Sequence, residues 1–256
     1  MSAITIAVTN QKGGVGKTTT AVNVSYYLAK SGNRVLLIDF DPQGNATSGL
    51  GIEKSQLKSS ILDVIEKSAG IGDVKIDLQF KNLSLVPARP ELANAEPGLA
   101  TAPDRFNRLK SAISAVKDDY DYIIIDVPPS LGLLTVNALT AAKYILLPVQ
   151  AEFYAMEGLG QLLETMQLVR QKLNPTLDLL GVLVTMYDAR TTLSAQVYEE
   201  IAKHFPGKVF ETKIPRNVRL AEAPSNGLPV GSYDGLSKGA RAYKTATKEL
   251  IERTEK

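Results

Sequence analysis

Short runs of apolar, mostly β-branched residues recur along the chain at wide intervals. They span 4–8 (ITIAV), 34–39 (RVLLID), 83–88 (LSLVPA), 122–127 (YIIIDV), 144–149 (YILLPV) and 179–185 (LLGVLVT). Consecutive apolar positions are typical of strands that are buried on both faces of a parallel sheet. The pattern therefore predicts a buried strand in each run.

Longer stretches between these runs have the helical period, with apolar residues every three or four positions. Three of them span 17–30, 104–117 and 154–173. Strands that alternate with helices predict an α/β fold, with a doubly wound, mostly parallel sheet and helices on both faces. We expect one such domain over residues 1–256, because the length suits one large domain and no linker or repeat divides it. Only the loop-rich segment 50–103 has no clear place in this scheme.

The composition mainly excludes classes of chemistry. The chain is 44% hydrophobic and 22% charged, as in ordinary globular proteins. With no cysteine and a single histidine, His204, it has no disulfide scaffold, thiolate metal site or cysteine nucleophile, and a Ser-His-Asp triad is disfavoured. No apolar stretch of about 18 residues and no secretory signal pattern is found. We therefore expect a cytoplasmic protein without a membrane partner.

The segment TNQKGGVGKTTT (9–20) places a glycine-rich loop between the first strand and the first helix. A phosphate-binding loop has Gly, four residues and then Gly-Lys-Ser/Thr, and here Gln11 replaces the first glycine. Backbone N–H groups and the helix N-terminus make such a loop an anion site. The candidate ATP ligands are Lys12, Gly13, Gly14, Val15, Gly16, Lys17, Thr18 and Thr19. Lys17 would reach the β- and γ-phosphates, and the Thr18 hydroxyl would bind Mg²⁺.

Carboxylates follow two of the predicted strands, and the carboxyl ends of parallel strands meet at one edge of the sheet. Asp126 is in the place of the aspartate that holds the Mg²⁺ shell in P-loop enzymes. We predict that Asp41 orients the attacking water and that Asp39 supports the metal shell or the loop. The alternative is that one of them only caps the turn at 42–44.

A second lysine, Lys12, stands five positions before Lys17 in the loop. Two ammonium groups so close together repel each other. That cost is understandable if Lys12 serves a phosphate shared with another subunit, as an arginine finger does in trans. The loop therefore predicts a homodimer with ATP at the interface, in which Lys12, Lys17 and Asp41 are the catalytic residues.

The segment KGGVGKTT (12–19) is similar to the deviant Walker A motif of the ParA/MinD superfamily, whose signature lysine falls on Lys12. Five more segments resemble ParA/Soj-type chromosome-partition ATPases: LLIDFDPQGNATSGLG, DYIIIDVPPSLGLLTVNAL, PVQAEFYAMEGL, VLVTMYDART and IPRNVRLAEAPS. The resemblance covers residues 3–252. It implies an ATP-bound sandwich dimer that binds double-stranded DNA without sequence preference. It also implies a ParB-type partner that stimulates hydrolysis and releases the dimer from DNA.

The resemblance also implies roles for particular residues. It implies that Asp41 is the aspartate that acts in hydrolysis and that Asp126 is the Walker B aspartate. The adenine side falls on Met186, Pro215, Arg216 and Asn217, and DNA contacts fall on Arg190 and Arg219. Plasmid relatives carry an N-terminal DNA-reading domain before the first strand, whereas the first strand here is at 4–8, so operator reading by that route is not expected.

Basic residues are concentrated in the last quarter of the chain. The segment 203–248 holds nine basic and three acidic residues, against a net charge of +2 for the whole chain. On a helical wheel one face of the last helix is basic, with Lys238, Arg241, Lys244 and Lys248. The opposite face is expected to hold Leu236, Ala240, Tyr243, Thr247, Leu250 and Ile251. Such a stripe indicates contact with a phosphate backbone, and a merely solvated helix is the alternative.

Other classes of ATPase use the same loop. A MinD-like membrane-cycling ATPase would need bulky apolar residues in its terminal helix, whereas KELIERTEK has only Leu250 and Ile251. An iron–sulfur carrier would need cysteines, and a bacterial tyrosine kinase would need a tyrosine-rich tail. A small-molecule ligase or kinase on the same fold remains a minor alternative. Its turnover would depend on a metabolite, whereas that of a partition ATPase would depend on DNA and a partner protein.

Overall fold

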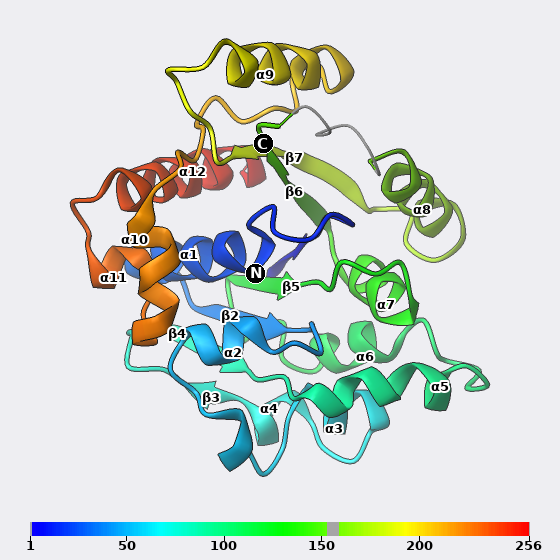
Figure 1. The fold of residues 1–256 in the computed structure, drawn as a ribbon. Helices are drawn as coiled ribbons and strands as arrows, with labels where there is room; N and C mark the ends of the chain where they lie inside the picture. Colours follow the sequence, from blue (N-terminus) through cyan, green and yellow to red (C-terminus); the bar gives the residue numbers. More distant parts are fainter. Residues whose placement is uncertain (1, 153–158, 256) are drawn as a thin grey trace.

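The computed structural model describes residues 2–152 and 159–255, which are built around one seven-stranded sheet (Figure 1). The strand order is β3-β4-β2-β5-β1-β6-β7. The strands are β1 (Ile4–Val8), β2 (Val35–Asp39), β3 (Ile76–Asp77), β4 (Leu83–Val86), β5 (Tyr122–Asp126), β6 (Tyr144–Gln150) and β7 (Asp178–Thr185). All pairs are parallel except β3 with β4. The six predicted strands are confirmed, and the short edge strand β3 is an addition.

Helices cover both faces of the sheet (Figure 1). They are α1 (Lys17–Lys30), α2 (Asn45–Gly49), α3 (Ile61–Glu66), α4 (Ile71–Val74), α5 (Ala95–Leu99), α6 (Arg108–Ser114), α7 (Leu133–Ala141), α8 (Leu159–Lys172), α9 (Thr192–His204), α10 (Val218–Glu222), α11 (Val230–Tyr233) and α12 (Lys238–Thr254). Three short 3₁₀ turns lie at Lys54–Gln56, Pro90–Asn94 and Ala223–Asn226. The doubly wound α/β fold predicted from the sequence is confirmed.

The central strands divide their side chains between two hydrophobic cores. In β1, Ile6 packs into the core under α1 and α12, and Ala7 packs into the opposite core under α3, α6, α7 and α8. The same alternation holds for Ile124 and Ile125 in β5. Successive side chains of a strand point to opposite faces. A strand with a core on each side must therefore be apolar at every position, which explains the continuous runs in the sequence.

Helices α1 and α12 lie against the same face and are joined by buried polar contacts. The Thr20 hydroxyl of α1 is 3.0 Å from the Tyr243 hydroxyl of α12. At the far end of α12, the Thr254 hydroxyl is 3.1 Å from the Tyr122 hydroxyl of β5. Buried hydroxyls need such partners, so these pairs fix how α12 lies along α1 and the sheet.

Two helix predictions need correction. The stretch 104–117 is helical only over Arg108–Ser114, because Asn137 Nδ2 donates to the Arg105 carbonyl at 2.7 Å and holds the preceding residues in turns. Leu236 does not share the apolar face of α12: it precedes the helix and is 82% exposed, since Ser237 caps the N-terminus.

Two other segments complete the comparison. The predicted helix 154–173 is confirmed over Leu159–Lys172, and its first residues lie outside the described ranges. Apart from the predicted strand at 83–88, which is β4, the segment 50–103 contains α3, α4, α5 and β3, whose lengths are too short for a clear period. Across the described residues, none of the helices is both long and apolar enough to cross a membrane.

Tyr243→Phe should destabilise the protein, because it leaves the buried Thr20 hydroxyl without its partner. We expect a loss of about 1–2 kcal/mol in the free energy of unfolding, or about 2–8 °C in Tm. Calorimetry would measure it. The double variant Thr20→Val/Tyr243→Phe should recover part of the loss, because it leaves no unpaired hydroxyl, and strictly additive losses would contradict the proposed contact.

Candidate active site

The glycine-rich loop connects β1 to α1, and two of its glycines have left-handed backbone conformations. Gly14 and Gly16 have φ angles of 75° and 89°, a left-handed conformation that glycine adopts without strain. A Cβ atom added to Gly13 or Gly14 would meet no atom within 4 Å. Asn10 fixes the start of the loop, because its Nδ2 donates to the Pro148 carbonyl at 2.8 Å and its Oδ1 accepts from a loop N–H at 3.0 Å. The loop is thus fixed at its start, and its backbone is exposed at Gly13 and Gly14.

The two lysines of the loop have different surroundings. Lys17 is only 7% exposed, and its Nζ donates to the carbonyl of Lys12 at 3.0 Å. Burial lowers the pKa of Lys17, while the charges of Asp126 and Asp41 act in the opposite direction. The Lys12 side chain lies at the rim, 37% exposed, with Nζ 3.9 Å from a carboxylate oxygen of Glu152. One lysine therefore faces the interior of the loop and the other its edge.

A buried carboxylate without partners lies beside the loop. Asp126 ends β5, next to Val8 of β1, and is 1% exposed. Neither of its oxygens has a hydrogen-bond partner among the described residues. Burial raises the pKa of Asp126 well above its usual range and the nearby charge of Asp39 adds to the shift, while the Thr18 hydroxyl and the charge of Lys17 oppose it. An unpaired buried carboxylate is costly, so this position suits an additional cation.

Asp39 is paired in register with Asp126 across β2 and β5, but its carboxylate is occupied. Oδ2 accepts from the Thr47 backbone N–H at 2.8 Å and from the Thr47 hydroxyl at 2.6 Å. Burial raises the pKa of Asp39 to about 6, although the bonds from Thr47 oppose the shift. These contacts fit the loop-support alternative, because they hold α2 against the strand end. A role of Asp39 in the metal shell stays a prediction.

Asp41 lies on the loop after β2, close enough to Lys17 for its charge to act on that lysine. It is 7% exposed, and its Oδ1 accepts from the Gln43 N–H at 2.9 Å. Its charge is one of the two that raise the pKa of Lys17. The loop conformation thus fixes the carboxylate close to the loop lysine, the place where a water-orienting group is needed.

The donor set suits magnesium better than a softer metal. The Thr18 hydroxyl and the Asp126 carboxylate are oxygen ligands, and Mg²⁺ is usually held by one or two such groups together with phosphates and water. No cluster of three or more His, Cys, Asp or Glu side chains that could hold a metal occurs in the described part of the chain. These residues therefore fit a Mg²⁺ ion that is bound together with nucleotide.

A cavity of about 320 Å³ opens beside the N-terminus of α1. It is lined by Gly16, Thr19, Thr185, Met186, Ile214, Pro215, Arg216, Asn217, Leu220, Ala221 and Tyr243. Met186 has φ 51°, an uncommon value for a residue other than glycine. The conformation is held because the Tyr187 N–H donates to the Ile214 carbonyl at 2.9 Å. The structure thus brings the four residues implied for adenine to the end of the phosphate loop.

Three residues of the site were not predicted. Glu152 joins the two halves, because one carboxylate oxygen is 3.0 Å from Arg216 and the other is 3.9 Å from Lys12. The Thr185 hydroxyl donates to the Val15 carbonyl at 2.8 Å, and Tyr243 lines the cavity from α12. These contacts join residues far apart in the chain, so no local pattern could have revealed them.

The residues predicted to contact DNA do not form a single cluster. Arg190 is paired with Asp188 at 2.7 Å, and Arg219 is paired with Glu222 and Asp234 at 2.8 and 3.3 Å. Lys238, Arg241 and Lys244 are exposed on α12. Both arginines are therefore engaged in ion pairs in the free chain.

A glycine-rich loop between a central parallel strand and a helix, with a buried lysine inside and a buried aspartate on the adjacent strand, defines a P-loop nucleotide triphosphatase. Residues 3–179 match the family model described as an AAA domain. The chain is 56% identical over 245 residues to the sporulation initiation inhibitor protein Soj of Bacillus subtilis (strain 168), which covers 96% of this chain and 97% of that protein.

Further comparisons agree with this class. The chain is 48% identical over 248 residues to the chromosome partitioning protein ParA of Myxococcus xanthus (strain DK1622), covering 97% and 88% of the two chains. The solved structure of cobyrinic acid a,c-diamide synthase from Mycobacterium smegmatis, with an ATP analogue and magnesium bound, has a TM-score of 0.88 and 38% identity. That likeness covers 99% of this chain and 96% of that one. The chain belongs to the ParA/Soj family of chromosome-partitioning ATPases.

Asp126→Asn should stabilise the nucleotide-free protein at pH 7.5, because it removes a buried carboxylate that has no hydrogen-bond partner among the described residues. A carboxyl whose pKa is raised by folding makes the folded state less stable as pH rises. For Asp39 this loss falls between about pH 4 and 6. We expect a Tm increase of about 2–4 °C for Asp126→Asn at pH 7.5, the shift that about 1 kcal/mol produces, and weaker Mg²⁺-dependent nucleotide binding.

Asp121→Asn is a matched control just before the other end of β5. Arg34 donates to the Asp121 carboxylate and lowers its pKa, so this variant should be less stable at pH 7 and lose the difference under acid conditions. Thermal melts between pH 4 and 8 would compare the two. A lower Tm for Asp126→Asn at pH 7.5 would contradict the assignment of Asp126 as an unpaired buried carboxylate.

Proposed function

We propose that this protein is an ATP-hydrolysing DNA-partitioning protein that cycles between a monomer and an ATP-bound sandwich dimer. The observation that carries the proposal is the division of the two loop lysines. Lys17 is buried inside its own loop, whereas Lys12 lies at the rim with a partly exposed side chain. A rim lysine beside a phosphate site can reach a second subunit, and ATP then lies between the two chains.

In the proposed complex the loop N–H groups and Lys17 bind the β- and γ-phosphates, and the Met186 and Pro215–Asn217 segments flank the adenine. Thr18 and Asp126 hold Mg²⁺, which when bound neutralises charge on the phosphates. Relatives support this ligand choice, because the Mycobacterium smegmatis protein was solved with an ATP analogue and magnesium. The left-handed backbone of the glycine-rich loop and the unpaired Asp126 oxygens are the matching features of this chain.

Hydrolysis is assigned to Asp41, which orients a water toward the γ-phosphate. Its carboxylate is already fixed by the Gln43 N–H and lies near enough to Lys17 to affect its pKa. Asp39 supports Asp41 indirectly, because its bonds to Thr47 hold the loop that carries Asp41. Lys12 of the partner subunit completes the charge around the phosphates.

The DNA-bound state uses the basic residues on the α12 side of the molecule and is sequence-independent. Lys238, Arg241 and Lys244 are exposed and have no carboxylate within 4.0 Å among the described residues. Arg190 and Arg219 would have to exchange their carboxylate partners for phosphates. A ParB-type protein stimulates hydrolysis and returns the dimer to monomers, so the protein associates with the nucleoid only in its ATP state.

Two other functions fit the fold less well. A MinD-like membrane cycle needs free apolar residues on the terminal helix, whereas Leu250 is fully buried and Ile251 packs against the same core. A small-molecule amide synthase is suggested by the name of the Mycobacterium smegmatis protein. Its turnover would depend on a metabolite, whereas the proposed cycle depends on DNA and a partner protein.

Asp41→Ala should bind ATP, dimerise and remain on DNA, because it removes only the water-orienting carboxylate. We expect a loss of about 100-fold or more in hydrolysis. Light scattering after size exclusion should show a dimer with ATP and a monomer with ADP. Asp41→Asn retains an acceptor for the Gln43 N–H and should behave in the same way. Wild-type hydrolysis in either variant would refute the role of Asp41.

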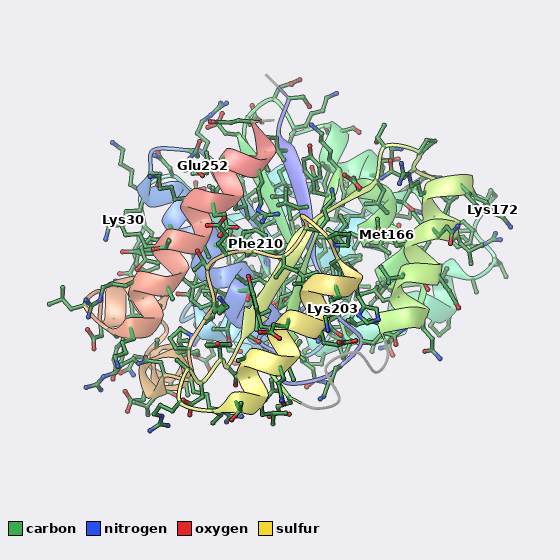
Figure 2. The ribbon with its side chains drawn as sticks, turned by 90° about the horizontal axis from the view of Figure 1, so that it is seen from above. Lys30, Met166, Lys172, Lys203, Phe210 and Glu252 are labelled. Atoms are coloured by element: carbon green, nitrogen blue, oxygen red, sulfur yellow. The ribbon has the colours of Figure 1, made fainter. Side chains whose placement is uncertain are left out.

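Lys12→Ala should abolish the ATP-dependent dimer while leaving the folded monomer intact, because it keeps the backbone bonds of Lys12 to Asn10 and Lys17 and removes only a rim contact of the side chain with Glu152. Lys12→Ala should be made in the Asp41→Ala background, where the dimer persists. Lys203→Ala is a suitable control, because Lys203 is an exposed lysine on α9 (Figure 2). A dimer that survives Lys12→Ala would remove the basis of the sandwich arrangement.

A further inference from the structure

A groove runs between the end of α1 and the outer side of α12. It has a volume of about 750 Å³ and is lined by Tyr27, Lys30, Ser31, Arg241, Lys244, Thr245, Lys248 and Ile251. Figure 2 shows Lys30 at the end of α1, beside α12. The phosphate loop is at the other end of α1, so the groove is separate from the nucleotide site.

The lining of the groove carries a net positive charge. Its lining includes four cations and no carboxylate. Lys30 Nζ contacts the Tyr26 hydroxyl at 3.2 Å, and Lys248 has one long contact of 3.9 Å with Glu252. No carboxylate of the described residues lies within 4.0 Å of the Arg241 or Lys244 cation. Like charges gathered in this way repel one another, so the groove suits an anionic ligand.

The spacing of the cations fits an extended polyanion better than a single small anion. Arg241, Lys244 and Lys248 follow one another along α12 and span roughly 10 Å at about 1.5 Å per residue. One DNA strand carries a phosphate about every 3.4 Å of helix axis, so the row matches several phosphates. The hydroxyls of Ser31 and Thr245 add neutral donors to the lining.

We propose that this groove binds the sugar-phosphate backbone of double-stranded DNA, with Lys30 and Lys248 as contacts in addition to Arg241 and Lys244. The inference rests on the proposed function and locates the DNA on this chain. Arg190 and Arg219 are engaged by carboxylates in the free chain, whereas Arg241 and Lys244 have no carboxylate within 4.0 Å among the described residues. A lipid surface is disfavoured, because Ile251 and the Tyr27 ring are the only large apolar groups in the lining.

The groove also relates DNA binding to nucleotide binding through shared elements. Helix α1 starts at the phosphate loop and ends at Lys30, and α12 carries both the groove cations and Tyr243, which lines the nucleotide cavity. The Thr20–Tyr243 contact joins the two helices between these sites. A change in how α12 lies on α1 would therefore alter both sites.

The test measures DNA affinity against salt for the Asp41→Ala dimer with ATP. Each contact removed lowers the slope of log K on log salt by about 0.9. Lys30→Gln removes one contact per protomer, so we expect the slope of the dimer to fall by about 1.8. Lys248→Gln should do the same. Lys172→Gln is the matched control, because Lys172 is exposed on α8 at the opposite side of the molecule (Figure 2).

The outcomes separate the two proposals. An Asp41→Ala dimer that binds no DNA at all would overturn the proposed function. A dimer that binds DNA with the same slope in Lys30→Gln, Lys248→Gln and Lys172→Gln would overturn the groove and leave the proposed function standing. Lys30→Arg keeps the charge and should keep the slope. Groove variants that no longer bind anionic lipid vesicles but still bind DNA as before would also overturn the proposal. Light scattering must show that each variant still dimerises with ATP.

Discussion

The burial of charge at one edge of the sheet is the constraint on which the rest of the structure depends. Asp39, Asp126 and Lys17 are almost inaccessible to solvent, where isolated charges are strongly disfavoured. They lie together because β2 and β5 are in register at Asp39 and Asp126, and β1 continues directly into the loop that carries Lys17. The two acids and one lysine do not satisfy one another completely. This incomplete balance favours a bound cation and phosphate.

The surrounding elements hold this arrangement from several sides. Asn10, at the start of the loop, donates a hydrogen bond to Pro148 of β6, and Thr185 of β7 donates one to Val15 of the loop. Thr47 of α2 holds the Asp39 carboxylate. Such contacts fix the positions of the charged groups before any ligand arrives, and fixed dipoles and charges cost no reorganisation during a reaction. The same helix that begins at this loop ends at the basic groove, so α1 connects both parts of the proposed cycle.

Much of the fold could be predicted because its signals are local. Each central strand is apolar at consecutive positions, since it has a core on both sides, and the 17–30 helix follows the glycine-rich loop directly. The predictions failed where tertiary contacts decide. Residues 104–107 were predicted as helix, but a hydrogen bond from Asn137 of α7 holds them in turns. Leu236 was predicted on the apolar face of α12, but Ser237 caps the helix after it. Helices of four to six residues between 50 and 103 are too short to show a period.

The sequence by itself determined the six long strands and their alternation with helices along the chain, the phosphate loop and the carboxylates that follow the strands. These features depend on neighbouring residues, whose spacing sets backbone conformation and burial. Only the tertiary structure decided which carboxylate is free and which is bonded. It also placed Glu152 between Lys12 and Arg216 and brought Lys30 beside Arg241. Such contacts join segments separated by dozens to hundreds of residues, and their geometry follows from the packing of helices on the sheet.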